Sequence, residues 1–163
     1  MNMCTARLLP AACLVIAGCS EPPLDGPPPL RLGRDECAEC GMLVSEDRCS
    51  SGAIVDRDGR HEHALFDDIG CMLDARDNTE GAFRVATMFV HDHASKEWVR
   101  ADQAWFMVTS PDRLRTPMGS GVVAFAAREA AEAAAQKYQG RVADLVGLDA
   151  ARREQAHADE QKP

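Results

Sequence analysis

The sequence predicts an α+β fold, with two successive strand–strand–helix (ββα) units forming one compact head. Asp58-Gly59 lies between two β-rich segments, and this dipeptide favours a two-residue hairpin turn. A short run with one apolar face follows that hairpin, and an alanine-rich run lies near the C-terminus, as expected for two helices. Residues 35–148, which include both helices, are enough to form one domain with its own core.

The first unit is expected to be a hairpin followed by a short helix. Its elements are predicted at Ser51–Val55, His61–Phe66 and Asp67–Arg76. Ile69, Met72 and Leu73 share one face of the helix, and Asp67 or Asp68 suits its N-terminus.

The second unit is expected to begin with further strands and to end with the alanine-rich helix. Its elements are predicted at Arg84–His91, Glu97–Arg100, Ala104–Thr109, Phe125–Tyr138 (the helix) and Arg141–Leu145. Gly140 occupies the usual position after the last turn of that helix. Before it, Pro117 and two glycines constrain a loop that carries Met118, a residue that either plugs the core or presents its sulfur outward.

The N-terminus has the composition of an export signal. The apolar run at 8–17 is too short to span a bilayer, and residues 1–18 are expected to form a signal peptide. The residues before Cys19 resemble a bacterial lipobox, so Cys19 is the expected lipidation site. Residues 19–34 form a proline-rich linker, 35–148 the head, and 149–163 a charged tail, either a loose helix or disordered.

Charge excludes one class of partner. The chain has 18 Lys and Arg against 26 Asp and Glu, a net charge of −8. This balance argues against nucleic-acid binding, which depends on basic side chains at phosphates. It is compatible with a cation carrier or with a merely solvated surface.

Cysteines are the residues most suggestive of a function. Cys37 and Cys40 form a Cys-x-x-Cys pair that Met42 follows, and thiolate and thioether sulfurs are ligands that select Cu(I). The same spacing fits a zinc half-site, a redox pair or a disulfide. Cys71 is expected either to pack in the core or to form a disulfide with Cys49.

Four short motifs, taken in order, resemble the NosL-type copper chaperones, a family of lipoproteins that assist assembly of nitrous oxide reductase. They are Asp35-Glu36-Cys37-Ala38-Glu39-Cys40-Gly41-Met42-Leu43-Val44, Leu65-Phe66-Asp67-Asp68, Val90-His91-Asp92 and Thr116-Pro117-Met118-Gly119. The first is fairly specific to the family and the others gain weight from their order. The resemblance covers residues 35–148, together with the lipobox.

This resemblance implies a two-unit ββα fold related to a domain of the organomercurial lyases, with no enzymatic activity and no catalytic residues. It further implies a periplasm-facing, lipid-anchored carrier that delivers Cu(I) to nitrous oxide reductase or its assembly machinery. Cys40 and Met118 are the first expected ligands, Cys37 and Met42 come next, and His91 is a further candidate. Metal would then lie between the two halves of the head.

Three alternatives remain open. Cys37 and Cys40 could serve a thiol–disulfide oxidoreductase, although the pair does not begin a helix after a βα unit. A structural zinc module could combine them with two of Cys49, Cys71, His61 and His63. Lyase activity is the third, because of the related fold, but fold does not imply function.

Overall fold

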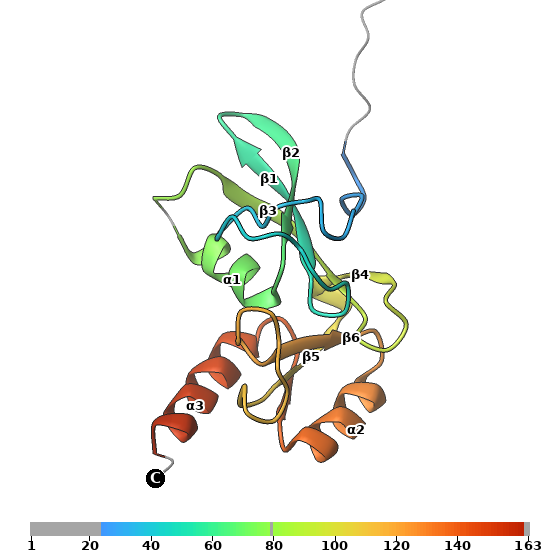
Figure 1. Cartoon of the computed structure of the whole chain (residues 1–163), viewed down its shortest axis with the longest axis vertical. Helices are drawn as coiled ribbons and strands as arrows, with labels where there is room; N and C mark the ends of the chain where they lie inside the picture. Colours follow the sequence, from blue (N-terminus) through green and yellow to red (C-terminus); the bar gives the residue numbers. More distant parts are fainter. Residues whose placement is uncertain (1–23, 79, 162–163) are drawn as a thin grey trace, which may run out of the picture.

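The computed structural model describes residues 24–78 and 80–161. This part of the chain contains two antiparallel sheets and three α-helices (Figure 1). The predicted α+β class is confirmed, and so are two ββα units, β1-β2-α1 and β5-β6-α2. The strands are β1 (Ser51–Arg57), β2 (Arg60–Phe66), β3 (Arg84–His91), β4 (Trp98–Arg100), β5 (Trp105–Val108), β6 (Val122–Phe125) and β7 (Arg141–Ala143). The helices are α1 (Ile69–Asp77), α2 (Arg128–Tyr138) and α3 (Leu148–Glu160), and Ala101–Gln103 forms a 3-10 turn.

The first sheet has the order β2-β1-β3-β4 and packs against α1. Asp58 and Gly59 join β1 to β2 with φ angles of 54° and 80°, so the predicted two-residue turn has the positive φ values that a type I′ turn requires. Asp68 is the residue that caps α1, because its Oδ1 accepts a hydrogen bond of 2.7 Å from Gly70 N. The predicted hairpin and helix of the first unit are therefore present.

The second sheet has the order β6-β5-β7, and its two faces have different neighbours. Successive residues of a strand point to opposite faces. On β5, Phe106 and Val108 belong to the main core that also contains residues of α1 and α3. Met107, between them, packs in a smaller core with Ala131 of α2. The β5 strand is therefore buried on both sides, and one of its faces packs against the first unit.

Three details of the second unit differ from the prediction. The strands β3 and β4 extend the first sheet instead of starting the second. The strand β6 was not expected, because all four of its residues are buried and its apolar run does not alternate. The helix α2 begins at Arg128 rather than Phe125, and the left-handed residue after it is Gln139 (φ 51°), not Gly140.

The segment after β3 joins the two sheets. Asp92 forms an isolated parallel bridge with Ala124 of β6, and His93 N donates to Ala124 O at 2.8 Å. The Asp92 carboxylate accepts a further hydrogen bond from Ala126 N at 3.3 Å. The Val90-His91-Asp92 motif therefore lies at the junction of the two units.

The described part of the proline-rich segment lies against the head (Figure 1). Pro28 is buried against Gly52 of β1, and Gly26 O is 3.0 Å from His63 Nε2 of β2. The predicted signal peptide and Cys19 fall outside the described residues. Within 24–78 and 80–161, no helix has the length and apolar character needed to cross a membrane.

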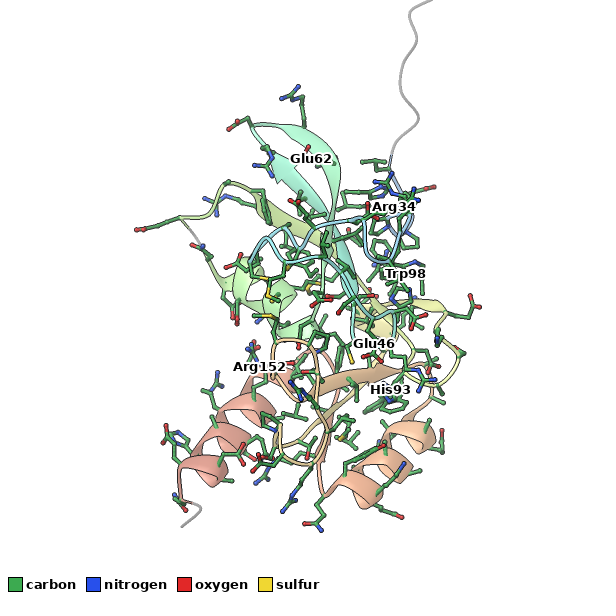
Figure 2. All side chains as sticks on the ribbon, viewed as in Figure 1. Arg34, Glu46, Glu62, His93, Trp98 and Arg152 are labelled. Carbon is green, nitrogen blue, oxygen red and sulfur yellow. The ribbon has the colours of Figure 1, made fainter. Side chains whose placement is uncertain are left out.

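The C-terminal segment is helical, which is one of the two alternatives that the sequence left open. Leu148 and Ala151 of α3 are buried in the main core. Arg152, labelled in Figure 2, lies between α3 and α1 and forms a 3.0 Å ion pair with Asp74. The helix α3 therefore packs on the first unit as well as on the second sheet.

Candidate metal centre

Residues 37–42, the cysteine loop, form a tight turn that separates their two thiols by exposure. Cys37 N donates to Met42 O at 2.7 Å, and Gly41 N donates to Cys37 O at 2.9 Å. Gly41 has a φ of 74°, a conformation that glycine adopts without steric cost. The turn buries Cys37 and exposes Cys40, so the pair consists of one interior and one surface thiol.

Hydrogen bonds attach this loop to the junction between β2 and α1. Ala38 N donates to Leu65 O at 2.8 Å. Three residues after the loop, Ser45 donates hydrogen bonds to the buried Asp67 carboxylate, from its N at 2.8 Å and from its Oγ at 3.2 Å. The loop is thereby held beside the first turn of α1, where Cys71 is the third helical residue.

Cys71 completes a cluster of three thiols with Cys37 and Cys40. The three Sγ atoms all lie within 4.8 Å of one another. Ligands bound at a metal–sulfur distance of about 2.3 Å in a trigonal arrangement are about 4 Å apart, so small side-chain movements suffice to bring all three onto one ion. We call these residues the three-thiol cluster. In Figure 2, sulfur atoms gather beside α1.

The cluster stabilises one thiolate in its interior. A hydrogen bond with the Cys71 thiol is the largest of the influences that lower the pKa of Cys37 to about 5, against the opposing effect of burial. Backbone N–H groups, including that of Cys40, contribute in the same direction. Cys37 is therefore ionised at neutral pH and ready to bind a metal.

The other two thiols hold their protons more tightly. The hydrogen bond to Cys37 and then burial raise the pKa of Cys71. Partial burial, together with the neighbouring Cys37, raises the pKa of Cys40. A soft cation that binds all three sulfurs must therefore displace protons from Cys40 and Cys71 but not from Cys37.

Both candidate thioethers are on the surface, at 53% exposure for Met42 and 42% for Met118. Met42 ends the cysteine loop itself. Met118 is far along the chain, yet its backbone N donates to Asp68 Oδ2 at 3.0 Å, which places its loop at the start of α1. The fold therefore brings Met118 to the helix that carries Cys71, on the side of the head where the two units meet.

His91 is placed in a different environment. It is buried, its ring lies against that of Trp98 with centroids 3.6 Å apart and planes tilted by 31°, and its Nδ1 is 2.9 Å from Ser50 Oγ. Burial lowers the pKa of His91, so the ring is neutral at pH 7. Among the described residues, the structure groups no histidine with the three thiols.

The disulfide considered between Cys49 and Cys71 is not present, because both cysteines are free. Cys49 lies in the smaller core with Met107 and Phe125, whereas Cys71 belongs to the main core and the three-thiol cluster. Burial is the main cause that raises the pKa of Cys49 to about 12, as expected for an unreactive core thiol.

Cys71 is the member of the cluster that the sequence did not place among the copper ligands, naming it only as a possible ligand of the alternative zinc module. It is three positions from Asp68, in the helix that directly follows the Leu65-Phe66-Asp67-Asp68 motif. Once that motif is placed at the end of a hairpin, a thiol in the first turn of the following helix lies close to any group bound at the junction between hairpin and helix. This proximity is the signal that could have identified it.

Comparisons with known proteins identify the family, through a family model, and the fold, through a solved structure. The family model described as NosL matches residues 31–151. A crystal structure of the copper chaperone NosL from Shewanella denitrificans superposes with a TM-score of 0.63, at 23% sequence identity, covering 76% of this chain and 95% of that one. The search of curated proteins returned no match. The family match spans most of the sequence, and this chain therefore belongs to the NosL family.

Proposed function

We propose that this protein is a Cu(I) carrier, without catalytic activity, that receives and releases the ion at the three-thiol cluster. The observation that supports it best is the meeting of Cys37, Cys40 and Cys71 Sγ atoms within 4.8 Å, with a surface thioether carried to the same helix by another loop. Sulfur donors of this kind select soft ions over Mg, Ca or Mn. Family membership and the copper chaperone of similar fold point in the same direction.

The differing exposure of the thiols suggests how the ion moves. Cys37 supplies a buried thiolate at neutral pH, and Cys40 supplies a sulfur at the surface. During release, a donor sulfur of the partner binds Cu(I) as the bond to Cys40 breaks, and the bonds to Cys71 and Cys37 break next. Cys40 and Cys71 regain protons from solvent, and Cys37 stays a thiolate. Copper stays Cu(I) throughout. Met118 and Met42 serve as further neutral donors at the rim of the cluster.

A thiol–disulfide oxidoreductase fits the geometry less well. In such sites the accessible cysteine of the pair has the lowered pKa and attacks the substrate. Here the pKa of exposed Cys40 is raised, and the lowered pKa belongs to buried Cys37. The more acidic thiol is therefore the buried one, whereas an oxidoreductase needs its exposed thiol to be the more acidic.

A structural zinc site also fits less well. Such sites are closed by four ligands. Within the described residues, the cluster has three cysteines and no fourth His, Cys, Asp or Glu. His61 is exposed and His63 faces Gly26 O, so neither completes the set. The related organomercurial lyases supply an analogy of fold, which does not establish an activity.

The cellular role follows from the family resemblance. We propose a periplasm-facing protein, lipid-anchored at Cys19, that delivers copper to nitrous oxide reductase or its assembly machinery. Deleting the gene should leave a reductase protein of normal abundance and low copper content. A fully copper-loaded reductase in the deletion strain would contradict this client.

Copper affinity tests the carrier itself. The reduced protein lacking residues 1–19 is titrated with Cu(I) against a chromogenic chelator, alongside Cys37→Ser, Cys40→Ser and Cys71→Ala. Each substitution should weaken Cu(I) binding by more than roughly 10- to 100-fold, the loss typical when a residue that contacts a metal ligand, and not the metal, is changed. Cys49→Ala is the matched control, because it removes a buried thiol outside the cluster.

Two results would contradict the proposal. Weak binding of Cu(I) by the unaltered reduced protein would rule out a carrier. Tight zinc that persists against a chelator, is lost in Cys40→Ser and is kept in Met118→Leu would establish the zinc module instead.

A further inference from the structure

The Asp68 carboxylate joins the two sulfur-bearing parts of the head. It is fully buried, and each of its oxygens accepts two hydrogen bonds. Oδ1 accepts from Gly70 N of α1 at 2.7 Å and from Ser120 Oγ. Oδ2 accepts from Thr116 Oγ1 at 2.7 Å and from Met118 N at 3.0 Å. One of the four donors belongs to α1, and the other three belong to residues 116–121, the Met118 loop.

These bonds saturate the carboxylate. An ionised Asp is an acceptor only, with about four lone-pair sites, and the four donors use them all. An amide in its place would offer one oxygen and two N–H groups. Its nitrogen would then face either the pair containing Met118 N or the pair containing Gly70 N, and each pair includes a backbone N–H that cannot accept. The arrangement therefore requires a carboxylate rather than Asn.

Side-chain packing also holds the Met118 loop close to the start of α1. A Cβ added to Gly70 would lie 2.6 Å from Ser120 Cβ, nearer than Cβ atoms approach in proteins. Thr116 Oγ1 also accepts a hydrogen bond from Gly121 N at 3.2 Å, so the loop is fixed at both ends through the hydroxyl that Asp68 holds. The backbone of Met118 thus has a defined position relative to the helix that carries Cys71.

We infer that Asp68 is a positioning residue, which sets the Met118 thioether beside the three-thiol cluster. The inference rests on the proposed function. A Met side chain has three rotatable bonds and a neutral sulfur, so it contributes to a metal site only when its backbone is held near the ion. Asp68 supplies that restraint without touching the ion.

A double-mutant cycle tests this role. Cu(I) affinity of the reduced protein is measured by chelator competition for the unaltered protein, Asp68→Asn, Met118→Leu and the double variant. Asp68→Asn should weaken Cu(I) binding by about tenfold in the protein that retains Met118. In the Met118→Leu background the same substitution should weaken it by less than about twofold. Additive losses would overturn the inference.

The neighbouring Asp67 provides a matched control. It is also a buried carboxylate before α1, but its hydrogen-bond donors are Ser45 N and Ser45 Oγ, which lie outside the Met118 loop. The effect of Asp67→Asn on Cu(I) affinity should be the same in the protein that retains Met118 as in Met118→Leu. Coupling of Asp67 to Met118 as strong as that of Asp68 would show a general effect on stability and would overturn the inference.

A spectroscopic measurement reports on the thioether directly. With methyl-labelled methionine, the Met118 resonance should shift when Ag(I), a soft analogue of Cu(I), binds the unaltered protein. In Asp68→Asn that shift should be lost or much smaller, while the cluster still binds. An undiminished shift would overturn the inference. If Asp68→Asn does not fold, Thr116→Val and Ser120→Ala each remove one donor and take its place in the cycle and in the spectrum.

The outcomes separate this inference from the proposed function. Tight Cu(I) binding that depends on the cysteines, with no effect of Met118→Leu, would retain the carrier and overturn the role of Asp68. Weak Cu(I) binding by the unaltered protein would overturn both.

Discussion

The cysteine loop and the Met118 loop both reach the start of α1, but they bring different donors and are held in different ways. The cysteine loop is short, local to the first unit, and places one thiolate in the interior. The Met118 loop comes from the second unit, is attached through Asp68, and carries a neutral thioether on a residue that is 42% exposed.

This difference suggests a division of labour. Charged thiolates give a soft ion its strongest bonds, and burial slows their exchange with solvent ligands. A thioether at the rim carries no charge and no proton, so it can join or leave without acid–base chemistry. We expect the cluster to set the affinity and the Met118 loop to adjust it. The following experiments are ordered from the largest expected effect to the smallest.

Thiol oxidation should separate the two regions most clearly. Diamide should link Cys37 to Cys40 or Cys71 and abolish Cu(I) binding, because a disulfide removes two of the three thiol ligands. Oxidation of the methionines alone should weaken binding and not abolish it. Chelator competition on each oxidised form measures both effects, with re-reduction as the control. Equal affinity of diamide-treated and reduced protein would show that the cysteines are not ligands.

Cys71→Ala should reveal the interaction between the two buried thiols. The ultraviolet absorbance of thiolate should titrate near pH 5 for Cys37 in the unaltered apo-protein, and at higher pH in the variant, which lacks the largest cause of the lowered pKa. Cys49→Ala should leave the midpoint unchanged.

The same pKa directions fix how copper affinity depends on pH. Above about pH 5, Cys37 has already lost its proton, so protons compete only for Cys40 and Cys71, whose pKa values are raised. Affinity should therefore rise with pH through neutrality and fall more steeply below about pH 5. An affinity independent of pH between 6 and 8, roughly, would contradict three-thiol ligation.

Met118→Leu should have a smaller effect than loss of any cluster cysteine. The two side chains have similar volume, so the fold should be retained and Cu(I) affinity should fall by about tenfold. Met42→Leu is the companion variant, on the other loop. Stronger dependence on Met118 than on Cys37 would reverse the division of labour proposed above.

Ser45→Ala should have the smallest effect. It removes the hydrogen bond from the Ser45 hydroxyl to Asp67 and leaves the one from Ser45 N. The free energy of unfolding should therefore fall by about 1 kcal/mol or less. Cu(I) affinity should change by less than about twofold, because the cysteine loop keeps its backbone attachment. A loss comparable to that of Met118→Leu would show that the hydroxyl bond holds the loop.

Much of the first unit could be predicted from local sequence. Asp58-Gly59 determines its turn, and an acidic residue before Ile69 determines the start of α1, because both depend on neighbouring residues only. The second unit was predicted less well. The strands β3 and β4 have strand-like composition, but composition does not say which sheet they join. The strand β6 lacks alternation, because both of its faces are covered.

The same division applies to the site. The sequence by itself determined a Cys-x-x-Cys-Gly-Met segment, its soft donors and its place in a family. Only the tertiary structure decided that Cys71 joins Cys37 and Cys40, that Cys49 does not, and that Asp68 holds the Met118 loop against α1. A thiol on an apolar helix face looks the same in sequence whether it packs in a core or meets a second thiol. The distinction depends on contacts between residues far apart in the chain, which form only when the sheets and helices pack.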